Sequence, residues 1–213
     1  MATIELRTFT YIDILQAQLA SFISTISQGF FPLEGQASLF VEVRPGISIN
    51  IVTDIVLKHA EVTPGMQIVE RAYGMLEIHS WDQGQVRAAG QAILQFYGME
   101  EKDRLKPVIM THEIITGIEG HQAMILNRNR MGEMLLEDET LYILECNPAG
   151  YAAFACNEAE KAANIHVLDV HTFGAFGRVY LGGTEEEINQ AAHRIQNVLN
   201  AIEGRTAGKE KYV

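Results

Sequence analysis

The residue types that most often do chemistry are present in this chain, but their spacing builds no recognisable site. Seven histidines show no HxxxH pair, and none lies within a few residues of either cysteine, so no metal-ligand set is expected. Gly182-Gly183-Thr184 precedes an expected helix and would be a weak phosphate signal, but no Walker lysine accompanies it. No nucleophile is paired with a base. We therefore expect no catalytic residue, no metal and no cofactor.

One charged doublet lies at a position where it could act. Glu70 and Arg71 end an expected strand and come just before Tyr73-Gly74, which predicts a tight connection to the next strand. An acid and a base at a turn often form an exposed ion pair, worth roughly 0.2–1 kcal/mol. From the residues alone, a surface pair without a role is the favoured interpretation.

The elements that position these residues occur twice. When the sequence is shifted by 103 positions it matches itself without a gap. The matched identities include Thr8/Thr111, Gly29/Gly132, Glu42/Glu145, Pro45/Pro148, Lys58/Lys161 and Gly74/Gly177. The repeat predicts two similar domains, residues 1–103 and 104–213, related by a rotation. Such copies imitate two subunits of a ring within one chain.

Each copy is expected to contain four strands and three helices. In the first copy, strands are expected at 4–11, 39–43, 66–72 and 75–78, with helices at 12–27, 47–60 and 82–96. In the second, strands are expected near 107–113, 140–146, 166–172 and 177–181, with helices near 115–130, 150–163 and 184–202. Gly29 is expected to end the first helix, and Asp82 to cap the third. This order predicts an α+β fold with helices packed on small antiparallel sheets.

Composition excludes several classes of protein. The formal charge is −11, spread as −6 over residues 1–103 and −5 over the rest, which argues against nucleic acid or an anionic membrane as partner. The first residues contain no apolar signal segment, and no apolar run approaches the ~20 residues that span a bilayer. Cys146 and Cys156 are expected to be reduced structural thiols. We expect a cytosolic protein.

Three segments of the second copy resemble the bacterial microcompartment shell domain. They are Leu141–Gly150 (LYILECNPAG), Asn157–Ile165 (NEAEKAANI) and Gly177–Ile188 (GRVYLGGTEEEI). The first copy carries a similar opening, Ala37–Gly46 (ASLFVEVRPG). In the usual shell domain this strand and helix come first, whereas here residues 4–36 and 107–139 precede them. That order is similar to the circularly permuted, tandem-domain shell proteins that form trimers.

The resemblance implies a function in assembly rather than in catalysis. Members of this family form homotrimers that act as pseudohexagonal tiles, with a gated pore on the threefold axis for small metabolites. Two trimers can stack face to face. The partners implied are other shell proteins, which are hexameric tiles and pentameric vertices, within the shell of a microcompartment in the cytoplasm.

The same resemblance assigns roles to particular residues. It implies that Glu70 and Arg71 are the pore gate, and that the loop with Phe173 and Gly174 lines or supports the pore. It places Lys58 and Lys161 at the tile edge, with Asn127-Arg128 as a weaker edge candidate. Either lysine would also stabilise a helix C-terminus, by about 0.3–1 kcal/mol.

Two rival functions remain open from the sequence. Duplicated α+β units also form trimeric ligand-binding regulatory proteins, which bind a metabolite at subunit clefts and do not tile. An enzyme with its site between the copies is weaker, because no residues support it. The sequence does not identify the type of microcompartment, the permeating metabolite or the signal that opens the gate.

Overall fold

A computed structural model describes residues 3–207 of the chain. The first copy contains β1 (Glu5–Ile12), α1 (Ala17–Ile26), β2 (Ala37–Arg44), α2 (Ile49–His59), β3 (Thr63–Glu70), β4 (Tyr73–Ser80) and α3 (Gln83–Tyr97). The second contains β5 (Val108–Ile115), α4 (Gly120–Asn129), β6 (Thr140–Asn147), α5 (Tyr151–Ala162), β7 (His166–His171), β8 (Gly177–Gly183) and α6 (Glu185–Ala201). Short 3-10 turns lie at Gly46–Ser48 and Glu101–Asp103.

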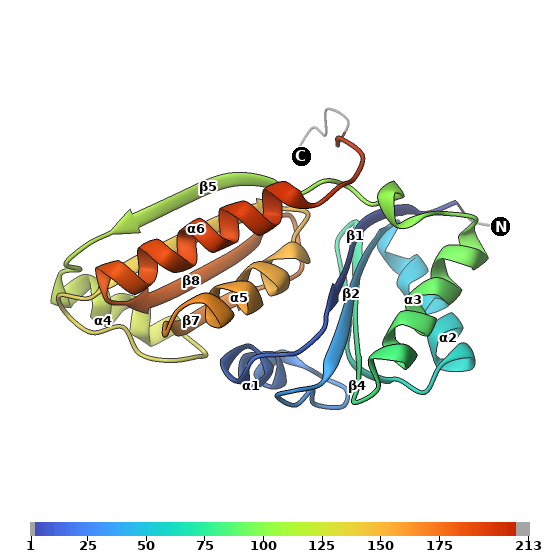
Figure 1. The fold of residues 1–213 in the computed structure, drawn as a ribbon, viewed down its shortest axis with the longest axis horizontal. Coiled ribbons are helices and arrows are strands. Elements are labelled where there is room, and N and C mark those ends of the chain that lie inside the picture. The colour runs from blue at the N-terminus through green and yellow to red at the C-terminus, as the bar shows by residue number, and fades with distance from the viewer. Residues whose placement is uncertain (1–2, 208–213) are drawn as a thin grey trace.

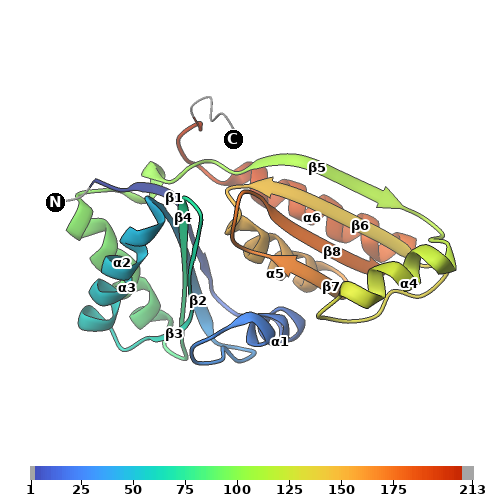
Figure 2. The same cartoon turned by 180° about the vertical axis from the view of Figure 1, so that it is seen from behind.

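Each copy forms one four-stranded antiparallel sheet, which confirms the expected α+β class. The strand orders are β1-β2-β4-β3 and β5-β6-β8-β7, so the second sheet repeats the topology of the first. Figures 1 and 2 show the two sheets side by side, with α2 and α3 covering one face of the first and α5 and α6 one face of the second. The domain boundary after residue 103 stays a prediction.

Three helix ends differ from the expectation. Helix α4 begins at Gly120 rather than near residue 115, because Ile115 still belongs to β5. The first helix begins at Ala17 rather than near residue 12, because Ile12 still belongs to β1. Gly29 does not end that helix, which stops at Ile26. Gly29 instead donates its N–H to the Gly65 carbonyl, and a Cβ on Gly29 would lie 2.5 Å from the Pro64 oxygen. Glycine is therefore needed for the close approach of two backbones. Asp82 caps α3 as expected, since its side chain accepts a hydrogen bond from the Gly84 N–H.

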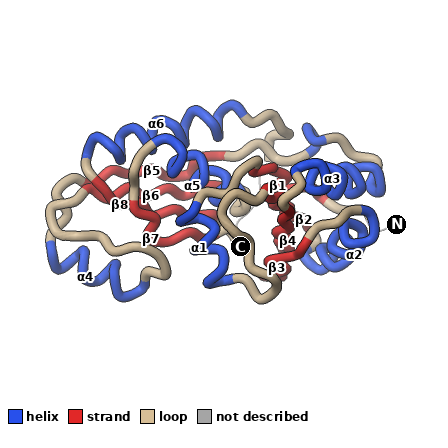
Figure 3. Tube along the Cα trace, turned by 60° about the horizontal axis from the view of Figure 1, so that its bottom comes forward, coloured by secondary structure: helices blue, strands red, loops and turns tan. Residues whose placement is uncertain are grey.

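The first sheet is covered on both of its faces. Its helix side forms an apolar core with α2 and α3, which includes Leu39, Val41 and Leu76. On the other side, Phe40 and Met75 belong to the same core as α5 of the second copy. Helix α1 reaches across to β7 and α5, as Figures 1 and 3 show. We call this contact of β1, α1 and the first sheet with α5 and β7 the joint.

The matching side of the second sheet is open. Ile143 and Glu145, the counterparts of buried Phe40 and Glu42, are only partly buried, and Arg178 is more exposed still. Helix α4, the counterpart of α1, lies at the far end of the second copy, away from the joint (Figure 2). The two copies therefore have the same fold but different surroundings.

Both cysteines are free thiols inside the protein. Burial, foremost, raises the pKa of the Cys146 thiol to about 12 and that of Cys156 well above its ordinary value. Protonated, inaccessible thiols agree with the structural role predicted for both. Within residues 3–207, no helix has the length and apolar character needed to cross a bilayer.

Candidate functional site

The turn between β3 and β4 presents the charged doublet to solvent. Glu70 and Tyr73 are paired across the hairpin, so only Arg71 and Ala72 form its tip. Arg71 has φ +51°, a left-handed conformation that non-glycine residues adopt rarely and mostly at turns or functional sites. Its side chain is 86% exposed, and its Nε lies 3.9 Å from Oε1 of Glu70. This loose, solvated pair leaves both side chains able to turn toward other partners.

The loop between β7 and β8 meets this turn. Gly174 has φ +96°, and a Cβ placed on it would lie 3.7 Å from Cγ of Glu70. Phe173 is partly buried against the large core that contains α5. Thus Glu70 and Gly174, predicted from separate copies, are brought together. A hydrogen bond to Asp169 raises the pKa of His171 at the start of the same loop.

A buried ion pair that sequence reasoning missed lies at this end of the joint. Arg7 is fully buried, and its Nε donates to Oε1 of Glu42 at 2.8 Å. The other oxygen of Glu42 accepts from the Thr8 hydroxyl and from the Gly150 N–H, both at 3.1 Å. The sequence held one signal for it: Arg7 is charged where its counterpart is Met110, although the neighbouring Thr8 and Thr111 are identical.

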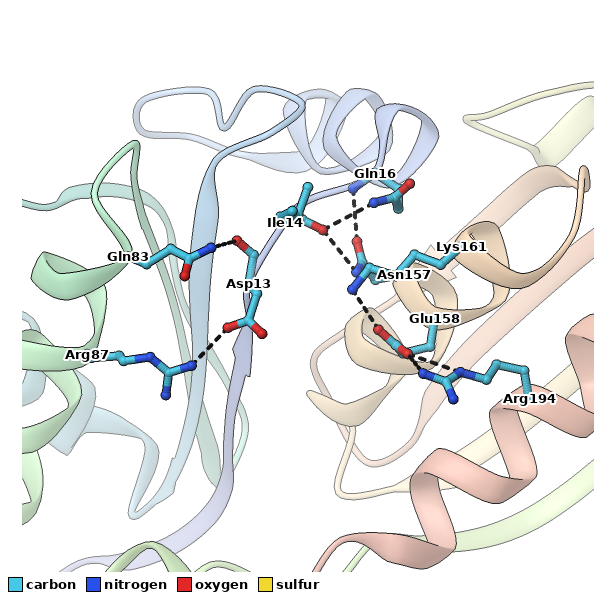
Figure 4. Close-up of polar contacts among 9 residues, drawn as sticks. All are labelled: Asp13, Ile14, Gln16, Gln83, Arg87, Asn157, Glu158, Lys161 and Arg194. Atoms are coloured by element: carbon cyan, nitrogen blue, oxygen red, sulfur yellow. Dashed lines mark hydrogen bonds and ion pairs between the residues drawn. The ribbon is translucent and has the colours of Figure 1, made fainter.

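At the other end of the joint, the second copy satisfies the start of α1, as Figure 4 shows for Asn157. The Asn157 side chain accepts from the Gln16 N–H at 2.9 Å and donates to the Ile14 carbonyl at 3.2 Å. Glu160 accepts from the N–H groups of Gln18 and Leu19 at 2.8 and 3.1 Å. Burial, foremost, raises the pKa of Glu160. These bonds take up backbone donors that the first turn of any helix leaves unpaired.

The two lysines predicted at the tile edge have different surroundings. Lys161 donates to buried Glu158, which also pairs with Arg194 (Figure 4). Burial alone would raise the pKa of Glu158, but its bonds to Lys161 and Arg194 bring it below the ordinary value. Lys58 forms an exposed pair with Asp54 at 2.7 Å. Both lysines lie in the last turn of their helices, where a cation is favourable.

The weaker candidates have structural explanations. Asn127 bonds both backbone groups of Leu135, at 2.7 and 2.9 Å, and so holds the loop after α4. Arg128 lies in the last turn of α4. Thr184 caps α6 in a reciprocal pair with Glu187, so its hydroxyl is already engaged. Over the part of the chain that the structure describes, no group of three or more His, Cys, Asp or Glu is arranged to hold a metal ion.

Comparisons with known proteins give a consistent result. Residues 6–103 match the family model described as the CsoS1D N-terminal domain. The chain is 50% identical to the carboxysome shell protein CcmP of Synechococcus elongatus over 202 residues, which cover 95% of each chain. It is 44% identical to the carboxysome shell protein CsoS1D of Hydrogenovibrio crunogenus, covering 95% of this chain and all of that one.

Two solved structures share the whole fold. The double-ringed trimeric shell protein MSM0271 from the RMM microcompartment superposes with a TM-score of 0.93 at 42% identity, covering 96% of this chain and 100% of that one. The fused permuted hexameric shell protein MSM0275 from the same compartment gives 0.90 at 44% identity, covering 93% and 99%.

Proposed function

Because this chain belongs to the CcmP and CsoS1D family of tandem-domain microcompartment shell proteins, we propose that three copies of it assemble into a pseudohexagonal tile with a central pore. The family is structural and not enzymatic. Its relatives are carboxysome proteins, so the carboxysome shell is the location we propose. The name of one related structure, a double-ringed trimer, supports pairs of trimers stacked as two rings. No observation favours the regulator or the enzyme considered from the sequence.

The observation that carries this proposal is that each of the two surfaces that meet in the joint has a counterpart in the other copy, and both counterparts are exposed. Around α5, Gly150, Asn157 and Glu160 approach the first copy, and Phe154, at helical spacing with them, packs against the core that the two copies share. Their counterparts around α2 are Ile47, Ile51, Asp54 and Leu57. These four are exposed, and three are apolar. The first copy thus presents the stripe that the second copy uses for docking, and no residue of 3–207 in the same chain covers it.

The receiving half is open on the second copy. A cavity of about 210 Å³ lies between α4 and the open side of the second sheet, and Ile125, Leu126 and Arg178 contribute to its wall. Their counterparts in the first copy are Phe22, Ile23 and Met75, which pack with α5 in the core. Docking the α2 stripe of one chain into this groove of the next fills both halves. Such head-to-tail contacts close into a ring when the rotation permits.

A closed ring would bring three copies of the Glu70–Arg71 turn together. Each turn lies beside the 171–177 loop at one end of the joint, so both loops would repeat around the axis. Ion pairs of roughly 0.2–1 kcal/mol each sum to about 0.6–3 kcal/mol over three chains. A gate of that strength opens measurably often, which suits controlled passage of small metabolites. We assign Glu70 and Arg71 to the gate and Phe173 and Gly174 to its support.

The outer edge is the remaining part of the proposal. Lys58 and Lys161 are placed at contacts with neighbouring shell proteins, which would be hexameric tiles and pentameric vertices. Lys58 is exposed and pairs with exposed Asp54, whereas Lys161 binds buried Glu158. The Lys161 side chain would therefore be held more firmly at its contact than the Lys58 side chain at its own.

Native mass spectrometry followed by electron microscopy tests the tile directly. Wild-type protein is expected as trimers or paired trimers that show discs with a central pore. Ile51→Arg places a charge in the docking stripe and should give folded monomers, because an unpaired charge is costly in an apolar contact. Gln95→Arg, on an exposed part of α3, is the matched control and should stay trimeric. A monomeric wild type would overturn the tile, and a trimeric Ile51→Arg variant would overturn the docking arrangement.

A further inference from the structure

The buried cluster around Arg7 does more than join the two copies. Its guanidinium lies over the ring of Tyr73 at 3.8 Å, and Tyr73 is the first residue after the Arg71–Ala72 tip. A guanidinium so close to an aromatic face is held by cation–π attraction, which strengthens away from water. The Arg7 side chain therefore contacts the first loop directly.

The same side chain reaches the second loop through one intermediate. Arg7 Nη2 lies 3.5 Å from Oδ1 of Asn147, and Nδ2 of Asn147 donates to the carbonyl of Ala175 at 2.8 Å. Ala175 belongs to the 171–177 loop, next to Gly174. Both amide ends of Asn147 are thus engaged, one toward each loop. The orientation of this amide is set, since a flip would place two donors or two acceptors together.

Glu42 keeps Arg7 in this position. Three donors around the carboxylate of Glu42 satisfy both of its oxygens, so the pair is buried with its hydrogen bonds made. Breaking such a pair by removing one partner leaves an uncompensated charge, which makes the arrangement persistent. The second copy has no equivalent: Met110 is 42% exposed, and Glu145 pairs instead with Arg178 of its own sheet.

We propose that Arg7 is a positioning residue that couples the 70–74 turn to the 171–177 loop, so that a displacement of either loop is transmitted to the other. The inference rests on the proposed pore for its functional meaning, because those loops line it. The coupling itself is a property of one chain. A cluster that only stabilised the joint would leave each loop to move independently.

Hydrogen exchange resolved by peptide, on the assembled protein, separates these two cases. Tyr73→Leu removes the aromatic face from the first loop and leaves Asn147 unchanged. Asn147→Asp keeps the acceptor toward Arg7 and replaces the donor to Ala175 with an oxygen. Coupling predicts that each variant raises exchange in both segments, 70–74 and 171–177, by about threefold or more. Faster exchange confined to the altered loop, in both variants, would overturn the proposal.

A stronger variant and a matched control complete the test. Arg7→Met with Glu42→Gln removes both charges together and should raise exchange in both loops by about tenfold. Arg87→Met is the control, since Arg87 also pairs with a carboxylate, Asp13 at 3.0 Å, and lies 5.1 Å from the centre of a tyrosine ring. It lies on α3 and pairs within the first copy, outside the joint (Figure 4), and should change neither loop.

The two single variants keep the test decisive if the double variant does not fold. Native mass spectrometry of the same samples reports the oligomer independently. A wild-type protein that is not a trimer would count against the proposed tile. If the protein is a trimer but each variant raises exchange only in its own altered loop, that result would count only against the role of Arg7.

Discussion

The two copies share a fold and a register of identical residues, yet they bury different sides of themselves. Helix α1 of the first copy lies inside the joint, with Phe22 only 3% exposed. In the second copy its counterpart on α4, Ile125, is 61% exposed. The reverse holds for the docking helices, because the α5 stripe is covered and the α2 stripe is not. The duplicated chain thus makes one such contact within itself, the joint. It also leaves exposed the two surfaces, the α2 stripe and the side of α4, that correspond to the partners in that contact.

The capping of α1 and α4 shows how the sequences diverged around this difference. Glu160 of the second copy caps α1, whose own first residues offer no side-chain cap. Its counterpart in the first copy is Leu57, which could not cap anything. Helix α4 is capped from within by Glu119, which accepts from the N–H groups of His121 and Gln122. The joint inside the chain thus adds specific polar caps to its apolar core, while three of the four residues of the exposed α2 stripe are apolar.

The largest difference should appear when Phe22 and Ile125 are truncated. Phe22→Ala is expected to lower the free energy of unfolding by about 3–5 kcal/mol, because it leaves a cavity in the core. Ile125→Ala should cost under about 0.5 kcal/mol in a single chain, because its side chain is exposed. Urea unfolding in the Ile51→Arg background, where only one chain is present, measures both. Equal losses of unfolding free energy in the two variants would mean that the Ile125 face of α4 is already covered in a single chain.

Removing the cap of α1 should have a smaller effect on stability. A substitution in the second copy should also change amide exchange in the first. Glu160→Leu is expected to cost about 0.5–2 kcal/mol and to speed exchange of the Gln18 and Leu19 amides, about 140 residues away. Glu119→Leu should speed exchange only within α4. Hydrogen exchange of the two helix starts measures both variants. Unchanged Gln18 and Leu19 amides in Glu160→Leu would show that the interdomain cap does not stabilise α1.

The ion cluster of Glu158 and Lys161 on α5 with Arg194 on α6 should make stability depend on pH through the second copy. Because the pKa of Glu158 is lowered in the folded protein, its charge adds stability above its ordinary pKa of 4.5, and this is lost as the pH falls through the folded value. Glu158→Gln should flatten the loss of stability between about pH 5 and 3. Ile55→Val changes the counterpart position, which is not titratable, and should leave the slope unchanged. An unchanged slope in Glu158→Gln would argue against an ionised cluster.

The smallest effect is expected at the two lysines. Lys58→Ala removes an exposed pair with Asp54, worth about 0.3–0.5 kcal/mol. Lys161→Ala should cost more, because buried Glu158 loses one of its charged donors. Thermal unfolding at low and high salt compares them, and added salt should remove most of the Lys58 effect. A larger loss for Lys58 would contradict the difference between the two helices.

Much of the fold could be predicted, because periodicity and the repeat are local properties. The strands, the second helices of each copy and the Asp82 cap all lie close to their expected places. The start of α1 at Ala17 was missed, since the apolar spacing of a strand end and of a helix overlap near Ile12 and Leu15. The role of Gly29 was wrong because its partner, Gly65, comes from a distant strand.

Less of the candidate site was accessible from sequence. The exposed position of Glu70 and Arg71 followed from the strand and turn pattern, while their role as a gate stays a proposal. The approach of Gly174 to Glu70 and the reach of Arg7 to Asn147 join residues more than 100 positions apart. Only the mismatch between Arg7 and Met110 hinted at the cluster.

The sequence by itself determined that a unit of strands and helices occurs twice, that the chain is acidic, and that no catalytic set is spaced for chemistry. It could not determine which face of each sheet is covered. Phe40 and Ile143 are both apolar residues of matching strands, and their patterns alone predict similar burial. The tertiary structure decided the difference, because burial depends on the rotation that sets α5 against the first sheet. That rotation arises from contacts across the whole joint and leaves no periodic trace in either copy.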